Sequence, residues 1–423
     1  MPTDWRPLTV DPSKDHRPTD ARNTLTRPYP ADNVRDDALL EHAKQTTANL
    51  QQRMRDGGIE LAVFTDESSI AYLAGFWGYL GIEFGRPTLL VVRASDAPTV
   101  ITPLMESEMV SEMTWVEDVQ VWEDIGQRTW ERALAGALGA EPGEIWIERN
   151  SIPAVVRNHL DNTYPGVPLN DISPVLGAQR MIKTSFEIGI MKEAGQIAGA
   201  MMAAAHDSLR EGAREYESAL AVIEAGSRKA AGFLTDRGWD RFVSPMIHNL
   251  QILQSGSETS MVHRRANVRA YQKFDPVYFC FCNMAQFKQY KLGFDRMFHI
   301  GDVTDQSRDV QEAAIAAQQA AIAAIRPGVL AEDVAAAANE VYRERGYQTG
   351  YRTGRSIGVA YLEAPELKEG DKTVLQPGMT FAVDGGISVD GVTAGRIGDS
   401  IVVSETGFDY ITDYPRQILL SHH

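Results

Sequence analysis

The second half of the chain alternates long helical patterns with strand-like runs, and this order constrains the fold more than any other feature. Apolar residues recur at helical spacing over about 184–210, 214–232, 307–325 and 330–345. Strand-like runs lie around 275–283, 286–299, 379–384 and 396–404. Elements of these two kinds bury their apolar faces by packing against each other. The pattern therefore predicts an α+β domain in which long helices back a sheet.

The first half predicts a separate α/β domain. An apolar helical face runs from Asp36 to Asp56 and ends at Gly57-Gly58. Helical stretches separate some of the short β-rich runs that follow, at 59–65, 88–93, 99–102 and 144–147. Residues 1–35 are polar, rich in proline and without a sustained hydrophobic period, which indicates an N-terminal arm.

A change of pattern near residue 181 marks the predicted domain boundary. Thr184 and Ser185 can each cap the N-terminus of a helix, and Glu187 falls in its first turn, where a carboxylate is favourable. We therefore expect an arm over 1–35, an α/β domain over 36–180 and a second domain over 181–423.

Composition limits the partners and the compartment of the chain. Its 423 residues suggest more than one hydrophobic core, and the formal charge of −16 repels nucleic acid and anionic lipid. The sequence lacks a membrane-spanning apolar run and a signal-peptide pattern at its start. We therefore expect a cytoplasmic protein with no nucleic-acid or membrane partner. Cys280 and Cys282 have a poor spacing for a disulfide and are expected to be free thiols.

Seven short stretches, taken in order, resemble the superfamily of methionine aminopeptidase, prolidase and creatinase. One is Phe84–Pro87 in the first half, and another is the linker Lys183–Glu187. The others are Leu253–Gly256 with His263 following, Tyr278–Arg296, Gly354–Gly358, Leu375–Met379 and Arg396–Asp399. The resemblance implies a pita-bread domain over the second half, preceded by a creatinase-like N-terminal α/β domain.

The resemblance also indicates where the metal ligands of this superfamily would fall. Its metallopeptidases hold two metal ions with two Asp, one His and two Glu side chains, which suit divalent cations. The matching positions in this chain are Cys282 (or Asn283, one residue on), Gly293, Arg355, Asp384 and Gly398. A guanidinium cannot ligate a metal and repels a cation. We therefore expect no catalytic metal and no other cofactor.

Without these ligands, the chain most resembles the creatinase and ectoine hydrolase branch, which works without a metal. The resemblance implies that His263 is the general acid and base, because an imidazole can take a proton from water and return it to a leaving nitrogen. The alternative is a histidine with only a structural hydrogen bond. Some stretches resemble ectoine hydrolase more and others creatinase, so the resemblance does not single out a substrate.

Two carboxylates match positions that hold the substrate guanidinium in creatinase. Asp295 and Asp384 would flank a delocalised cation and orient it. Both are one methylene shorter than Glu, so the space between them should differ from that of creatinase. The alternative is that Asp384 merely forms a buried salt bridge with Arg355. Arg355 could otherwise bind the substrate, as a second carboxylate contact or as a donor to an oxyanion.

The first domain supplies a further set of candidates. Arg86 matches an arginine that, in creatinase, reaches into the active site of the other subunit and holds the substrate carboxylate. This match implies a homodimer with shared sites, whereas the alternative is a surface arginine after a turn. Phe84 would form an apolar wall on the same strand face by period-two alternation. Trp77 and Tyr79 either cover the site or pack in the ordinary way.

Cys282 and Tyr290 complete the candidate site. Cys282 could be a thiolate nucleophile near His263, or a core thiol in the interior strand 277–282. Tyr290 and Lys288 alternate on the next predicted strand, where they could line the site or be simply exposed.

These residues together predict a metal-independent hydrolase that cleaves an amidine-like or amide-like C–N bond in a small zwitterionic carboxylate. The same acid and base could serve a lyase or isomerase by abstracting a carbon-bound proton. A metallo-aminopeptidase or prolidase, and a binding protein of this fold that has lost catalysis, are the remaining alternatives.

Overall fold

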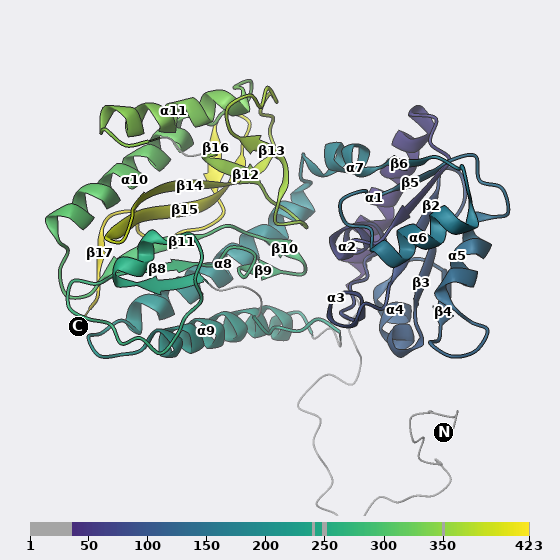
Figure 1. Ribbon diagram of the computed structural model, residues 1–423, viewed down its shortest axis with the longest axis horizontal. Helices are drawn as coiled ribbons and strands as arrows, with labels where there is room; N and C mark the ends of the chain where they lie inside the picture. The colour runs from purple at the N-terminus through teal and green to yellow at the C-terminus, as the bar shows by residue number, and fades with distance from the viewer. Residues whose placement is uncertain (1–35, 239–241, 248–251, 349–351, 423) are drawn as a thin grey trace, which may run out of the picture.

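The described part of the chain folds around two β-sheets that stand side by side, each with its own helices (Figure 1). The computed structural model describes residues 36–238, 242–247, 252–348 and 352–422. The predicted arm over 1–35 lies outside these residues. Among the described residues, no helix is both long enough and apolar enough to cross a membrane.

The first sheet has the strand order β4-β3-β2-β1-β5-β6. Its strands are β1 Leu61–Phe64, β2 Leu89–Arg93, β3 Thr99–Pro103, β4 Asp118–Trp122, β5 Ile145–Ile147 and β6 Leu169–Asp171. The accompanying helices are α1 Asp37–Asp56, α2 Glu67–Ala74, α3 Leu80–Phe84, η2 Leu104–Glu106, α4 Ser107–Met113, α5 Trp130–Leu138, α6 Ala154–Thr163 and α7 Ser173–Arg180. Along β1, Leu61 and Val63 enter one core while Ala62 and Phe64 enter another, so helices cover both faces of the sheet.

The second sheet has the strand order β13-β12-β14-β15-β11-β8-β7, with β16 paired to β15 and β17 to β11. Its strands are β7 Ile252–Ser255, β8 Pro276–Cys280, β11 Asp295–His299, β12 Gly354–Ser356, β13 Glu363–Leu367, β14 Thr380–Val389, β15 Thr393–Val403, β16 Phe408–Tyr410 and β17 Leu419–Leu420. Its other elements are α8 Ser185–Asp207, α9 Glu215–Asp236, η3 Gly256–Ser260, α10 Asp305–Ala324, α11 Ala331–Glu344 and a small hairpin of β9 Gln286–Phe287 and β10 Tyr290–Lys291.

The long helices lie on two sides of this second sheet. Figure 1 shows α10 and α11 along one side and α9 along the other, where α9 packs near β7. Helix α10 approaches β14 and β15 closely because Gly385 and Gly395 have no side chains. A Cβ on either glycine would overlap with a backbone carbonyl of α10. The two glycines therefore let α10 pack directly against β14 and β15, the strands that carry Asp384 and Gly398 of the candidate site.

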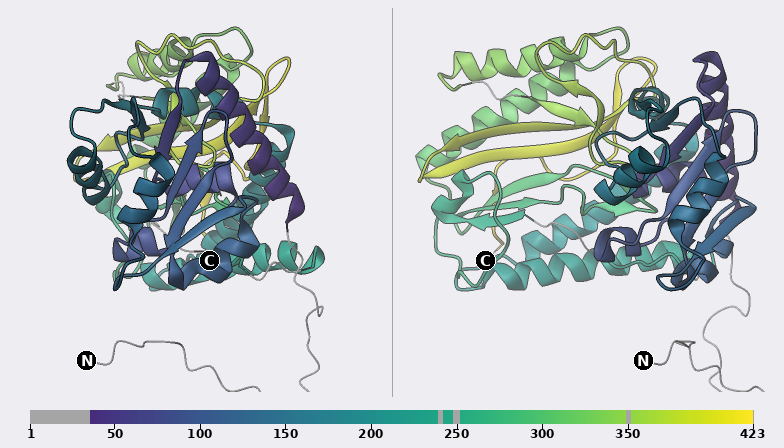
Figure 2. Two further views of the ribbon diagram at one scale, coloured as in Figure 1. Left: turned by 90° about the vertical axis from the view of Figure 1, so that its right-hand side faces the viewer. Right: turned by 45° about the vertical axis from the view of Figure 1, so that its right-hand side comes forward.

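A buried junction joins the two domains. Thr184 caps α8 and forms a capping box with Glu187, which confirms the predicted start of this helix. Just before it, buried Lys183 pairs with Glu363 at 2.7 Å. The two views of Figure 2 show the first domain standing against one end of the second. The linker is therefore fixed to the second domain by a specific ion pair.

Two predicted elements differ from the structure. The predicted strand over 286–299 is three short strands, because Lys288 and Gln289 adopt positive φ angles of 45° and 70° and turn the chain. Phe84 ends helix α3 instead of lying on a strand, so its predicted alternation with Arg86 on a strand face is wrong. Gly85 ends this short helix in the left-handed conformation, which a glycine adopts without strain.

Candidate active site

One face of the second sheet gathers the acidic and sulfur-containing candidates in a row. The register pairs Asp295 of β11 with Cys280 of β8 on one side and with Gly398 of β15 on the other. Gly398 in turn pairs with Asp384 of β14. Directly paired residues project from the same face of a sheet. Four neighbouring strands therefore place Cys280, Asp295 and Asp384 in one line, with a glycine between the two carboxylates.

Gly398 opens the space in which the two carboxylates meet. A Cβ at this position would overlap with Oδ2 of Asp295 and would lie 2.9 Å from Oδ1 of Asp384. Asp295 is buried, whereas the side chain of Asp384 is 34% exposed. Oδ1 of Asp384 is buried and accepts no hydrogen bond from a described residue. The site thus contains two converging carboxylates, at least one of which has an unused acceptor.

The electrostatic environment of Asp295 favours either a proton or a cation. Burial raises the pKa of its carboxyl well above the ordinary value, and the negative charges of Asp384 and Cys282 raise it further. Arg296 and Arg396 act in the opposite direction. A positively charged group placed beside Asp295 would relieve this unfavourable environment.

Arg355 fills the space next to this pair. Its buried guanidinium donates from Nη1 to Oδ2 of Asp384 and from Nη2 to the Tyr361 hydroxyl, whose ring centroid lies 4.5 Å from Cζ. Nη2 also lies 3.4 Å from Sγ of Cys282. A Cβ on Gly293 would be only 3.0 Å from the same Nη2 atom. The salt bridge considered as an alternative role for Asp384 is therefore present, and the guanidinium occupies the space that a side chain at position 293 would need.

The residues at this site do not fit the two-metal centre that the superfamily implies. Of the five positions matched to its ligands, Asp384 alone carries a carboxylate, and Arg355 already binds one of its oxygens. A guanidinium at the centre of such a site offers no lone pair and repels a cation. A different group of three ligand atoms, from Cys280, Cys282 and Asp295, lies within 4.8 Å of one another.

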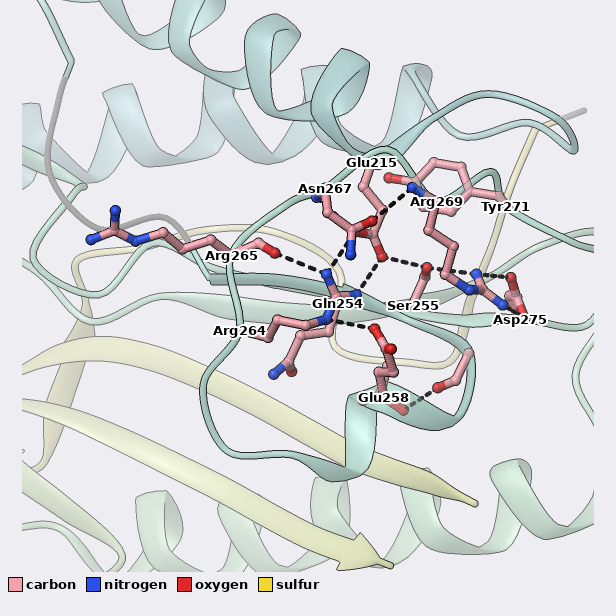
Figure 3. A network of polar contacts seen from close by, with 12 residues as sticks. Glu215, Gln254, Ser255, Glu258, Arg264, Arg265, Asn267, Arg269, Tyr271 and Asp275 are labelled. Carbon is pink, nitrogen blue, oxygen red and sulfur yellow. Dashed lines mark hydrogen bonds and ion pairs between the residues drawn. The ribbon is translucent and has the colours of Figure 1, made fainter. Parts of the chain in front are cut away.

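His263 lies on a loop that a buried ion-pair network anchors. Arg264 binds fully buried Glu215 at 2.6 Å and Glu258 at 2.7 Å. Figure 3 shows this network, in which Glu215 also accepts hydrogen bonds from Ser255 and from the backbone N–H of Asn267. The loop is therefore held in place independently of any ligand.

The imidazole of His263 itself has no polar contact with the described residues. His263 is exposed, and it forms no hydrogen bond or ion pair with any residue in the described ranges. Two residues earlier, the carbonyl of Met261 accepts a hydrogen bond of 3.3 Å from Arg396 of β15. The structure thus brings the loop against the strand of Gly398, whereas the imidazole is not bonded to Asp295 or Asp384.

Arg86 and Phe84 lie in the first domain, away from this row of residues. Arg86 forms an ion pair with Asp124 of the same chain, and its Nη1 lies 2.9 Å from Sδ of Met105. Phe84 is 67% exposed at the end of α3. Within one chain, the structure therefore does not bring these two residues to the carboxylates.

Tyr290 and Lys288 do not alternate along one strand as predicted, because Lys288 lies in the turn before β10. Tyr290 is buried and its hydroxyl donates to Glu187 at 3.3 Å, so it supports the start of α8. Lys288 pairs with Asp36 at the N-terminus of α1. These contacts tie the β9–β10 hairpin to its surroundings and leave neither residue bonded to Asp295 or Asp384.

A cavity of about 800 Å³ lies between the domains, and Trp77, Tyr79, Lys291 and Tyr361 are among its lining residues. Burial lowers the pKa of Lys291 to about 8, and its ammonium donates to the Val359 carbonyl at 2.6 Å. Sequence reasoning did not find Tyr361 or Lys291. Tyr361 belongs to no spaced motif and reaches Arg355 through the folding of a loop. Lys291 lies on β10, within the matched stretch Tyr278–Arg296, but the motif does not indicate that it lines the cavity.

Comparison with known proteins identifies both domains. Residues 189–405, slightly more than half of the chain, match the model of metallopeptidase family M24, and residues 47–182 match the creatinase/prolidase N-terminal domain. The chain is 27% identical over 413 residues to a creatinase from Bacillus sp. (strain B-0618), covering 94% of this chain and 97% of that protein. It is 28% identical over 389 residues to agropine synthesis cyclase from Rhizobium rhizogenes, covering 86% and 94%.

Solved structures show the same fold. Dipeptidase PepE from Mycobacterium ulcerans superimposes with a TM-score of 0.76 at 26% identity, covering 92% of this chain and 100% of that one. The prolidase from Pyrococcus horikoshii OT3 has a TM-score of 0.76 at 20% identity, covering 89% and 100%. The chain therefore belongs to metallopeptidase family M24, in the creatinase-like branch of the pita-bread superfamily.

Proposed function

We propose that the chain is a hydrolase that cleaves an amidine-like or amide-like C–N bond in a small zwitterionic carboxylate, without a metal ion. The observation that carries this proposal is the convergence of Asp295 and Asp384 over Gly398. Relatives of the chain include hydrolases, namely a creatinase and Xaa-Pro dipeptidases. The side chains around Arg355 favour the creatinase-like, metal-independent chemistry over the dipeptidase chemistry.

The cationic part of the substrate binds between the two carboxylates. Oδ1 of Asp384 supplies a buried acceptor without a hydrogen-bond partner among the described residues. Asp295 supplies a second carboxyl whose pKa is raised, chiefly by burial, and which a cation would help to ionise. A planar cation with several N–H groups can be held by both acceptors, which also stabilise it as its carbon becomes tetrahedral.

His263 activates the water and protonates the leaving nitrogen. Its exposed imidazole has no competing hydrogen bond within the described residues, and its loop is fixed through Arg264. Both features suit a group that exchanges protons with water and substrate. The buried Nε of Arg355, which also lacks a partner among the described residues, can donate to an oxygen that becomes negative during the reaction.

The substrate carboxylate is held from a second copy of the chain. In their own subunit, Arg86 pairs with Asp124 and Phe84 is exposed at the end of α3, and neither contacts the two carboxylates. In a homodimer, Arg86 of the partner subunit would leave Asp124 and bind the carboxylate through two N–H groups. Each site would then need both subunits.

A ligand screen followed by turnover measurement tests the proposal. Guanidino acids, ectoines and betaines are screened for an increase in the melting temperature, and stabilising compounds are assayed for release of an amine. We expect one class to bind and to be hydrolysed. His263→Ala should retain the melting shift but lose turnover by at least about 100-fold, whereas the neighbouring exposed Arg265→Ala should retain both. Equal turnover of His263→Ala and the parent protein would refute the assigned acid–base role.

A second candidate function is intramolecular ring closure. The relative named agropine synthesis cyclase and the cavity of about 800 Å³, which is large for a creatine-sized molecule, favour it. The same acid, base and carboxylates can join or cleave a C–N or C–O bond. Reaction in ¹⁸O-labelled water distinguishes the two, because hydrolysis incorporates the label and ring closure releases water.

A further inference from the structure

Cys280 and Cys282 place two sulfur atoms in contact at the end of strand β8. Their Sγ atoms are 2.7 Å apart, with the thiol of Cys280 donating to Cys282, and both cysteines are free. Cys280 is buried, whereas Cys282 is half-buried. The two sulfur atoms are therefore already close enough to join once one of them is oxidised.

The two sulfur atoms differ in their electrostatic surroundings. The hydrogen bond from Cys280 lowers the pKa of Cys282, and the Arg355 guanidinium 3.4 Å away lowers it further against the effect of burial. That hydrogen bond, burial and the charge of Asp295 raise the pKa of Cys280. Of the two thiols, the one at position 282 therefore loses its proton more readily, and the one at position 280 keeps it. Redox-active cysteine pairs share this arrangement of one activated thiol beside a second thiol.

From this geometry we propose that Cys282 and Cys280 form a peroxide-reactive dithiol, in which Cys282 attacks the oxidant and Cys280 resolves the product to an intrachain disulfide. The one-residue spacing is poor for a disulfide, but the structure already brings the two sulfur atoms into contact. Neither the sequence motifs nor the hydrolytic mechanism assigns this reaction to the pair. The oxidant is hydrogen peroxide, a small molecule that oxidises thiolates.

The reaction balances in two steps. The Cys282 thiolate attacks one oxygen of hydrogen peroxide, so that an S–O bond forms, the O–O bond breaks and the leaving hydroxide takes a proton to become water. Cys280 then attacks the Cys282 sulfur, so that the S–S bond forms and the S–O bond breaks. The second hydroxide leaves with the Cys280 proton as water. The two cysteines lose two electrons and one peroxide is reduced.

Oxidation changes the charge next to the proposed substrate site. The disulfide removes the negative sulfur that faces Arg355 and contributes to the environment of Asp295. The consequence for turnover rests on the proposed function, whereas the disulfide itself does not. Oxidised protein should therefore turn substrate over more slowly, and a thiol reductant should restore the rate.

Mass spectrometry of the full-length chain tests the proposal without a substrate. The reduced protein is treated with a slight excess of hydrogen peroxide, alkylated with N-ethylmaleimide and weighed intact. We expect both cysteines to escape alkylation, the mass to fall by about 2 Da, and dithiothreitol to reverse both changes. A protein that retains two alkylatable thiols would overturn the proposal.

Two variants assign the roles of the cysteines. Cys280→Ser should stop at an oxygenated Cys282, detected as a dimedone adduct or as a mass gain of about 16 Da. Cys282→Ser should leave Cys280 unreacted at the same peroxide concentration. Faster oxidation of Cys280 than of Cys282 would contradict the assignment of Cys282 as the attacking thiolate. A stoichiometric thiophilic ion held by Cys280, Cys282 and Asp295, which protected the thiols until a chelator removed it, would also overturn the proposal.

Discussion

Arg355 of β12 and Asp384 of β14 form an ion pair between neighbouring strands, on the sheet face that carries Asp295 and Cys280. The arginine is buried, and it also contacts Tyr361 and Cys282. In the superfamily that the chain resembles, the two positions carry metal ligands. The guanidinium of Arg355 thus lies near the carboxylates of Asp384 and Asp295, where a metal ion would otherwise balance the negative charge.

Breaking this pair from either side should destabilise the protein. Arg355→Met removes the cation beside Asp295 and Asp384 and should cost about 3 kcal/mol in the free energy of unfolding. Asp384→Asn should cost less, about 1–2 kcal/mol, because water partly screens this half-exposed carboxylate. Urea denaturation measures both values. The double variant should lose less free energy of unfolding than the two single variants lose together. A loss equal to that sum would contradict the pairing.

Gly398→Ala should abolish ligand binding by displacing the Asp295 carboxylate. The added Cβ would overlap with Oδ2 of Asp295, so the carboxylates could no longer converge on a cation. Gly386→Ala on β14 is the matched control, because its Cβ would meet no atom within 4 Å. The melting shift produced by the best compound of the screen should disappear in the first variant and persist in the second. A persistent shift in Gly398→Ala would place the ligand elsewhere.

The raised pKa of Asp295 should make stability fall as pH rises. Between the ordinary carboxyl pKa of about 4 and the higher folded value, the folded state holds a proton that the unfolded state lacks. The free energy of unfolding therefore decreases with pH in this window. Asp295→Asn removes the effect, so its stability relative to the parent protein should increase as pH rises above the ordinary carboxyl pKa of about 4 in urea titrations. Asp413→Asn, at an exposed position, is the control. The free energy of unfolding of this variant should change with pH in the same way as that of the parent protein.

A cationic ligand should release a proton when it binds at pH values below the folded pKa of Asp295. Calorimetric titration in buffers of different ionisation enthalpy measures the number of protons released. Binding should strengthen as pH rises through this range. Proton uptake on binding would contradict contact between the cation and Asp295.

Mixed dimers should show whether Arg86 acts across subunits. Arg86→Ala and His263→Ala should each be inactive alone. The two variants are denatured together in equal amounts and refolded, so that half of the dimers should be mixed. One of the two sites in each mixed dimer is intact, so about a quarter of the parent activity should return. If Arg86 served its own subunit, no mixed dimer would contain an intact site and no activity would return.

Local patterns were sufficient to predict most of the fold. The apolar faces of α1 and α8–α11 and the β-rich runs of β1, β2, β3 and β5 carry the expected periods. Strand β6 escaped prediction because its three residues, Leu-Asn-Asp, have low strand propensity and are held by pairing with β5. The turn at Lys288 and Gln289 also escaped, because no glycine marks its positive φ angles.

The candidate site was predictable only in part. The resemblance located Asp295, Asp384 and Arg355 and left open whether Arg355 pairs with Asp384, which the structure shows. The close approach of Cys280 and Cys282 depends on side-chain orientation at the end of β8, which a strand pattern does not specify. Tyr361 reaches Arg355 through the loop between β12 and β13, whose path no sequence period encodes.

Elemental analysis of the active protein tests the central claim most directly. Protein that turns over a compound from the screen is dialysed against a chelator, and its metal content and its rate are measured on the same sample. The arrangement of Arg355, Asp384 and Gly398 predicts far less than one metal ion per chain and an unchanged rate. One or more equivalents of zinc, manganese or iron, lost together with activity and restored together with it, would contradict a metal-independent hydrolase.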